Sequence, residues 1–167
     1  MILEEALQTS KFRNEQHKLL IHLMYTRSIL TIELKRMFRE HGITPEQYNV
    51  LRILVGQRGT PLALNDLTTR MLDPASNTSR LVEKLRQKNM LVRTECPSDR
   101  RRVDLVITAA GEQIVAQVDP DLRALEAHFE DNISTEEALK MNEALNRFHE
   151  SLQARCTGGK KTGIHLA

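Results

Sequence analysis

The chain contains no tryptophan, and two tyrosines and four phenylalanines make up an aromatic content of only 4% of 167 residues. The core must therefore be aliphatic. Glycine and proline are also scarce, at seven and five residues, and a chain rich in leucine, methionine and alanine with few helix breakers favours helices. These shortages argue against a large β-sandwich or barrel and predict a mainly α fold.

Features of export and of membrane insertion are missing as well. The two cysteines, Cys96 and Cys156, are too few to staple a chain of this length, which indicates a reducing compartment. No apolar run approaches the roughly 20 residues of a membrane-spanning helix. Acidic residues stand near the N-terminus, where a signal peptide carries basic ones. The sequence predicts a cytoplasmic protein with no membrane partner.

Positive charge is concentrated in the middle of the chain. Residues 70–102 hold nine lysines and arginines against four acids, whereas residues 103–167 hold six against eleven. The formal net charge of the whole chain is only +2. A compact basic segment is typical of a protein that meets phosphate with one part of its surface. A basic face that only contacts solvent is the alternative at this point.

The N-terminal part of the chain predicts two helices. Residues 11–40 contain neither glycine nor proline, and their apolar residues recur at steps of three and four. A helix of that length is too long for a small monomer to cover, which indicates a partner surface. Gly42 stands where a glycine commonly ends a helix. Thr44, followed by Pro45 and Gln47, has the pattern of a capped start for the second helix.

A short helix, a turn, a further helix and a hairpin are expected next. Asn65 is a suitable cap for a helix over residues 66–72, and Pro74 favours a turn after it. The next helix is expected over residues 75–88. Residues 91–107 then alternate like two strands that flank a charged tip. This order predicts a winged helix-turn-helix, an α+β lobe in which a small hairpin forms the wing.

Two further helices are expected in the C-terminal third. The first begins near Thr108 and runs to about residue 128, where we expect Pro120 to kink or interrupt it. Ser134 and Glu137 have the spacing of a capping box for a last helix that ends near Arg155. The Gly- and Lys-rich residues 157–167 are expected to form a flexible tail.

Two groups of residues are candidates for contacts with DNA. Short polar side chains at the start of a helix allow its backbone to approach base edges in the major groove, and arginines at a hairpin tip suit the narrow minor groove or the phosphates. Three successive arginines repel one another, which is tolerable against a polyanion. The candidate DNA-binding residues are Ser76, Asn77, Thr78, Arg80, Lys84, Asp99, Arg100, Arg101 and Arg102.

Residues 43–111 resemble the multiple-antibiotic-resistance regulator (MarR) family of bacterial transcription factors. The resemblance rests on Thr-Ser-Arg-Leu-Val-Glu-Lys-Leu from residue 78, on Lys-Asn-Met-Leu-Val-Arg from residue 88, and on the segment from Pro97 to Gly111. The family's wing carries an Asp-x-Arg signature, here Asp99 and Arg101, and then a strand that ends in Leu-Thr-x-x-Gly, with Ile in place of Leu here. Asn89 stands where the family usually has glycine, and asparagine tolerates the left-handed conformation.

The resemblance implies roles for further parts of the chain. It implies that the Asp99 carboxylate orients Arg101, and that the long first helix and the two C-terminal helices form a dimer interface. It also implies a crevice for a small-molecule effector between the DNA-binding lobe and the dimer helices. The expected lining residues of that crevice are His22, Tyr25 and Tyr48.

Our interpretation is a homodimer that binds double-stranded DNA at an inverted repeat, most simply a repressor that a small molecule releases. The expected parts are a dimerisation helix (1–42), a winged helix-turn-helix lobe (43–108), dimerisation helices (109–156) and the tail (157–167). No cofactor is expected. The six histidines lack the i, i+4 pairing of a helical metal site, so no metal is expected either.

Three other classes of protein remain as alternatives. The main one is a helical protein-interaction adaptor whose basic hairpin binds an acidic partner. An RNA-binding winged helix is disfavoured, because the chain has few aromatic residues to stack on unpaired bases. An enzyme is not expected, because the sequence shows no nucleophile–base pair, phosphate-binding glycine loop or paired carboxylates.

Overall fold

The structure is a computed structural model that describes the backbone of residues 2–96 and 99–157 and the side chains of residues 2–94 and 103–155. The chain divides into two units, Met1–Gly42 and Ile43–Ala167. The described residues are mostly helical, with a three-stranded antiparallel sheet in the second unit. The predicted fold class is therefore confirmed. Within the described residues, no helix has the length and apolar character required to cross a membrane.

The first unit is dominated by the helix α2, Glu15–Glu40. Asn14 is extended, and its side-chain oxygen accepts a hydrogen bond of 2.7 Å from the backbone N–H of His17. This cap explains why the helix begins there and not at the expected residue 11. Gly42 follows the end of the helix with φ 69°, the left-handed conformation expected of a glycine that ends a helix.

A short helix that the sequence analysis did not predict, α1, precedes α2 at Leu3–Leu7. Leu3 is only 4% exposed. Glu4 forms an ion pair with Lys18 of α2. The hydrogen bond from Lys18 is the main cause that lowers the pKa of the Glu4 carboxyl. An isolated helix of this length is unstable in water, so these contacts with α2 hold it.

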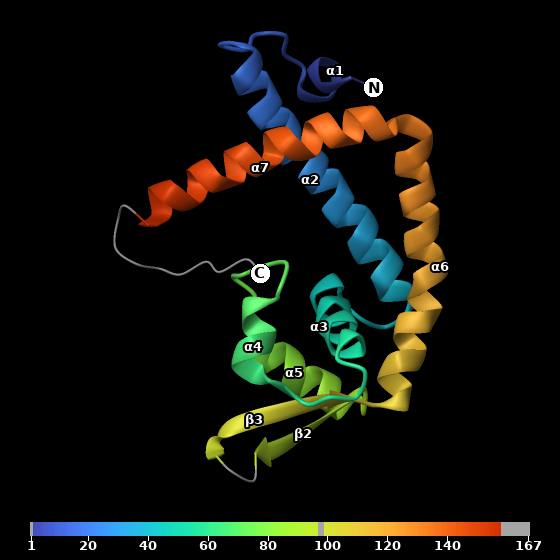
Figure 1. The fold of residues 1–167 in the computed structure, drawn as a ribbon. Helices are drawn as coiled ribbons and strands as arrows, with labels where there is room; N and C mark the ends of the chain where they lie inside the picture. The colour runs from blue at the N-terminus through green and yellow to red at the C-terminus, as the bar shows by residue number, and fades with distance from the viewer. Residues whose placement is uncertain (1, 97–98, 158–167) are drawn as a thin grey trace. The chain divides into compact units, whose positions relative to one another are not determined.

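The second unit begins with a lobe of three helices and a sheet (Figure 1). In the sheet, the strand order is β1-β3-β2, and Leu62 and Ala63 pair with Leu105 and Asp104. Fully buried leucines and valines from the helices and the sheet form its core. The elements of the lobe are α3 (Pro45–Gly56), β1 (Leu62–Ala63), α4 (Leu64–Thr69), α5 (Thr78–Gln87), β2 (Leu91–Cys96) and β3 (Asp99–Ile107).

The capped start of α3 is confirmed, whereas the bounds of the two following helices differ from the prediction. Thr44 Oγ1 accepts from the N–H of Gln47, and the Gln47 side chain accepts from the N–H of Thr44. α4 starts at Leu64 directly after β1, so Asn65 is not its cap. α5 starts three residues later than expected because Asn77 caps it.

A compact junction joins α5, the sheet and the next helix. Asn89 has φ 58°, which confirms the left-handed conformation expected there. Thr108 donates its hydroxyl to the carbonyl of Asn89 at 2.6 Å, and its backbone N–H bonds to the carbonyl of Met90 at 3.1 Å. The N–H of Gly111 donates to the Thr108 hydroxyl oxygen at 3.2 Å. This junction fixes the end of the hairpin to the first turn of the following helix.

The two C-terminal helices are α6, Ala109–Asn132, and α7, Thr135–Thr157. Pro120 lies inside α6 without interrupting it, and buried Val115 and Val118 pack the turns before it. Of the two expected outcomes, an interruption is wrong, because tertiary packing outweighs the one backbone hydrogen bond that proline removes, and a kink at Pro120 stays a prediction.

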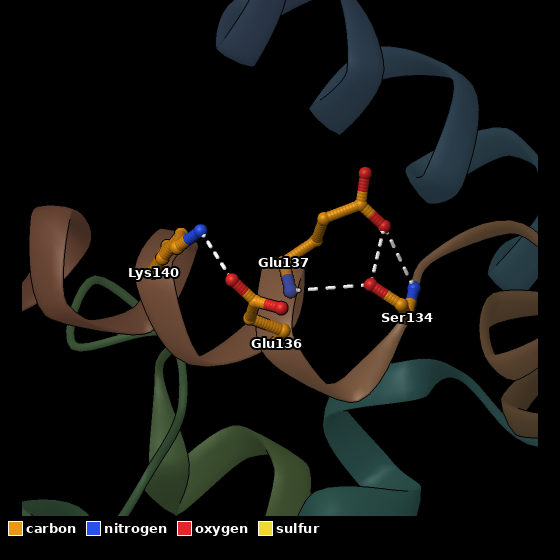
Figure 2. Close-up of polar contacts among 4 residues, drawn as sticks. All are labelled: Ser134, Glu136, Glu137 and Lys140. Carbon is orange, nitrogen blue, oxygen red and sulfur yellow. Dashed lines mark hydrogen bonds and ion pairs between the residues drawn. The ribbon is translucent and has the colours of Figure 1, made fainter.

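The predicted capping box at the start of α7 is confirmed (Figure 2). The backbone N–H and the hydroxyl of Ser134 donate to Glu137 Oε2 at 2.9 and 2.6 Å, and the N–H of Glu137 donates to Ser134 Oγ at 3.3 Å. An ion pair of 2.6 Å joins Lys140 and Glu136 in the same turns.

Candidate nucleic-acid interface

The helix α5 has one face inside the lobe and the other in solvent. Val82 and Leu85 are at most 1% exposed, and α5 packs against α3, α4 and β2. Arg80 and Lys84 lie on the exposed side. The helix is therefore held by its apolar face while its basic face is accessible over its whole length.

The start of α5 is fixed by its cap. Asn77 Oδ1 accepts a hydrogen bond of 3.0 Å from the N–H of Arg80 and so caps the helix. Ser76 is half-buried, and its carbonyl accepts from the N–H of Thr78 at 2.9 Å. Thr78 itself is only 4% exposed, which differs from the expectation that its hydroxyl faces a base. Ser79, the next residue, is exposed instead.

The charges on α5 are not equivalent. Glu83 accepts from Arg86 Nε and Nη2 at 3.0 and 2.9 Å. This hydrogen bonding is the main cause that lowers the pKa of the Glu83 carboxyl. Arg80 and Lys84 have no acidic partner among the described side chains. These two cations are therefore the ones on α5 that are available to a phosphate or a base.

The hairpin is longer than predicted, because β3 begins at Asp99 and Cys96 of β2 pairs with it. A register shift lies between Glu95 and Cys96. The side chains of Asp99 and of the three arginines that follow lie outside the described residues, so their contacts with DNA stay predictions. The expected sites there are Asp99, Arg100, Arg101 and Arg102.

The expected effector-binding residues lie in different units. His22 and Tyr25 belong to α2 in the first unit, whereas Tyr48 belongs to α3 in the second. Tyr48 is 9% exposed, and burial is the main cause that raises the pKa of its phenol. The crevice that would join the three residues stays a prediction. Within the described residues, no group of histidine, cysteine and acidic side chains is placed to hold a metal ion.

Asn49 is a residue of this lobe that sequence reasoning missed. Its side-chain oxygen accepts a hydrogen bond of 2.9 Å from the backbone N–H of Leu72, in the connection between α4 and α5. The two residues are far apart in the sequence, and a single asparagine in a helix gives no signal of such a contact. Only the packing of α3 against the helix-turn-helix reveals it.

This arrangement defines a class of protein. A short helix, a connection, a second helix with an exposed basic face, and a hairpin that pairs with a strand before the first helix make a winged helix-turn-helix.

Comparisons with known proteins find similarity to one family. A model of the MarR family matches residues 41–102. The HTH-type transcriptional regulator MhqR of Bacillus subtilis (strain 168) is 28% identical over 130 residues, which are 78% of this chain and 88% of that protein. Over these residues the chain is similar to the MarR family of transcriptional regulators.

Solved structures agree with this fold. AbsC, a MarR family transcriptional regulator from Streptomyces coelicolor, matches with a TM-score of 0.71 and 25% identity over 87% of this chain and 99% of its own. Sco3205, a MarR family regulator from the same organism solved in complex with DNA, matches with a TM-score of 0.71 and 21% identity over 86% of this chain and 91% of its own. The likeness to Sco3205 concerns the fold alone.

Proposed function

We propose that this chain binds double-stranded DNA in a sequence-specific manner and thereby regulates transcription. The observation that carries the proposal is α5, whose apolar face is buried while Arg80 and Lys84 are exposed and have no acidic partner among the side chains that the structure describes. A single helix fits the major groove of B-DNA, where its first turn meets base edges. The groups available at that turn are Ser76, Asn77 and Ser79. Thr78 is omitted because it is buried.

The wing supplies the second contact in this proposal. β1 and β3 tie the hairpin to the start of α4, so a wing that lies on the DNA backbone has a fixed distance from α5. Arg101 is proposed to enter the minor groove with Asp99 as its orienting partner, and Arg100 and Arg102 to contact phosphates. The family resemblance supports this assignment of the four residues.

A homodimer is proposed because α7 leaves an apolar stripe exposed. Met141, Leu145, Phe148 and Leu152 follow one another at alternating steps of four and three, and each is at least 40% exposed. This is the spacing of a seam between two helices. A hollow where α6 meets α7, lined in part by Phe129 and Met141, continues the same apolar surface. Two copies related by a two-fold axis present two α5 helices, which calls for an inverted repeat.

Repression with release by a small molecule is the mode of action that we propose. A dimer seated on its operator excludes other proteins from the same DNA. A ligand that releases it must bind the two conformations of the dimer with different affinity, typically by about 1–3 kcal/mol of coupling. His22, Tyr25 and Tyr48 are the proposed ligand contacts.

The test is selection of bound duplexes from random DNA by the purified protein, followed by titration of the selected duplex at several salt concentrations. We expect an inverted repeat and affinity that falls steeply with salt. Arg80→Ala should reduce the salt slope by about 1, as expected for one lost phosphate contact. Arg123→Ala is the matched control, because Arg123 is already paired with Asp119 on α6. Binding without any preference for duplex sequence would favour the adaptor with a basic hairpin.

A further inference from the structure

The connection between α4 and α5 is fixed to the lobe by two neighbouring residues in different ways. Met71 is 3% exposed and packs into the core. Leu72 has its side chain in solvent, at 83% exposure, and makes its long-range contact through its backbone N–H, which bonds to Asn49 Oδ1 of α3 at 2.9 Å. Every residue from Leu72 to Ala75 is exposed, so this stretch is placed by hydrogen bonds and not by packing, until Thr78 is buried again.

The backbone N–H of Leu72 lies between the last hydrogen bond at the end of α4 and the first hydrogen bond of the next turn. Before it, the N–H of Met71 bonds back to the carbonyl of Thr68 at 3.4 Å, which ends α4. After it, the Asp73 side chain accepts from the N–H of Ala75 at 3.0 Å and starts a separate turn. No nearby carbonyl continues the series at Leu72, and Asn49 supplies the acceptor in its place.

The first turn of α5 follows this contact closely along the chain, while the buried Thr78, Val82 and Leu85 hold the helix itself in the lobe. The Asp73 carbonyl accepts from the N–H of Ser76 at 3.1 Å, and Asn77 then caps α5. The order along the chain is thus Leu72, the turn at Asp73, the cap and the proposed base contacts. A change in the backbone position of Leu72 would therefore affect Asn77, the cap of α5, only a few residues later.

We propose that Asn49 is a positioning residue for DNA recognition: from α3, and without a contact to DNA, it sets the place of the connection from which the first turn of α5 starts. The inference rests on the proposed function. Loss of the acceptor allows the connection to sample other positions. DNA binding then selects the competent fraction, and the apparent affinity falls in proportion to that fraction.

The experiment compares wild type, Asn49→Ala and Asn49→Asp. Asn49→Asp retains an oxygen acceptor at the same distance from the backbone. Two quantities are measured: the affinity for the selected duplex at several salt concentrations, and the hydrogen-exchange rate of the Leu72 amide by NMR in the free protein. The matched control is Asn65→Ala on α4, which removes the same carboxamide from an exposed residue whose side chain makes no hydrogen bond among the described residues.

We expect Asn49→Ala to speed exchange at Leu72 and to weaken DNA binding by about 5- to 10-fold, the size of one lost hydrogen bond, with an unchanged salt slope because no phosphate contact is lost. Asn49→Asp should restore the slow exchange, and Asn65→Ala should change neither quantity.

Three results would overturn the inference: wild-type affinity in Asn49→Ala, unchanged exchange at Leu72, or a reduced salt slope, which would indicate a direct contact. If Asn49→Ala does not fold, exchange at Leu72 in Asn49→Asp decides, and fast exchange there counts against the proposal. If wild type binds no duplex, the proposed function has failed first, which is a distinct outcome.

Discussion

Replacement of Gly111 by alanine sets two physical effects against each other. Gly111 lies in the first turn of α6 and is buried. Helix propensity alone predicts that alanine stabilises the protein by up to about 1 kcal/mol. A Cβ at this position, however, would lie 2.7 Å from Ile107 Cγ1 and even closer to the carbonyl oxygen of Met90. The sign of the change in unfolding free energy therefore shows which effect dominates.

The steric effect is expected to win. Met90 contributes a backbone atom that cannot rotate away, and its carbonyl already accepts the N–H of Thr108 at 3.1 Å. Extra volume in a packed site costs about 3 kcal/mol at the upper end of the usual range. The gain in helix propensity offsets about 1 kcal/mol of this. Gly111→Ala should thus lower the free energy of unfolding by about 2 kcal/mol.

The measurement is urea denaturation followed by circular dichroism, at one fixed protein concentration because the proposed dimer would add a concentration-dependent contribution to stability. Ala110→Gly is the control, since Ala110 is exposed in the same turn and reports propensity alone, with an expected loss of about 0.5–1 kcal/mol. Equal or greater stability of Gly111→Ala would refute the steric reasoning. It would show that the backbone at the junction between Met90 and α6 can shift to make room for the added Cβ at little cost in free energy.

Three further predictions concern the wing, the dimer and the capping box. Asp99→Ala and Arg101→Ala should both weaken operator binding, and their effects should be non-additive when combined, because each removes the same oriented contact. Tighter binding by Asp99→Ala at fixed salt would show that this carboxylate does not orient Arg101. Leu145→Lys should yield a monomer in sedimentation at micromolar concentration, whereas an intact dimer would place the interface elsewhere. Hydrogen bonds from Ser134 lower the pKa of the Glu137 carboxyl below its usual 4.5. The stabilising contribution of this carboxylate is therefore fully present above pH 4.5 and is lost as the pH falls through the lowered pKa. Glu137→Gln should make thermal stability less sensitive to acid below pH 4.5, and an unchanged pH profile would contradict the assignment.

Patterns that depend on a few neighbouring residues were predicted well from the sequence. The caps at Thr44 and Ser134 and the left-handed residues Gly42 and Asn89 are each determined by local hydrogen bonds or by backbone sterics. The winged helix-turn-helix order followed from the change of period near residue 90. These features need no knowledge of what packs against them.

Features that depend on distant contacts were missed. α4 starts at Leu64, directly after Leu62 and Ala63 pair with β3, and no local signal near Asn65 shows that pairing. The burial of Thr78 follows from the way α5 packs in the lobe. The acceptor role of Asn49 likewise requires the connection after α4 to pass close to α3.

The two-residue strand β1 has a consequence for how the protein is made. α4 has only six residues and follows Ala63 directly, so it is too short to persist in water without its anchor. Its anchor, β3, leaves the ribosome much later than α4 itself. We therefore expect the first helix of the helix-turn-helix to become stable only once α5 and the hairpin, against which it packs, have been made. We also expect the helix-turn-helix and the wing to fold as one cooperative element.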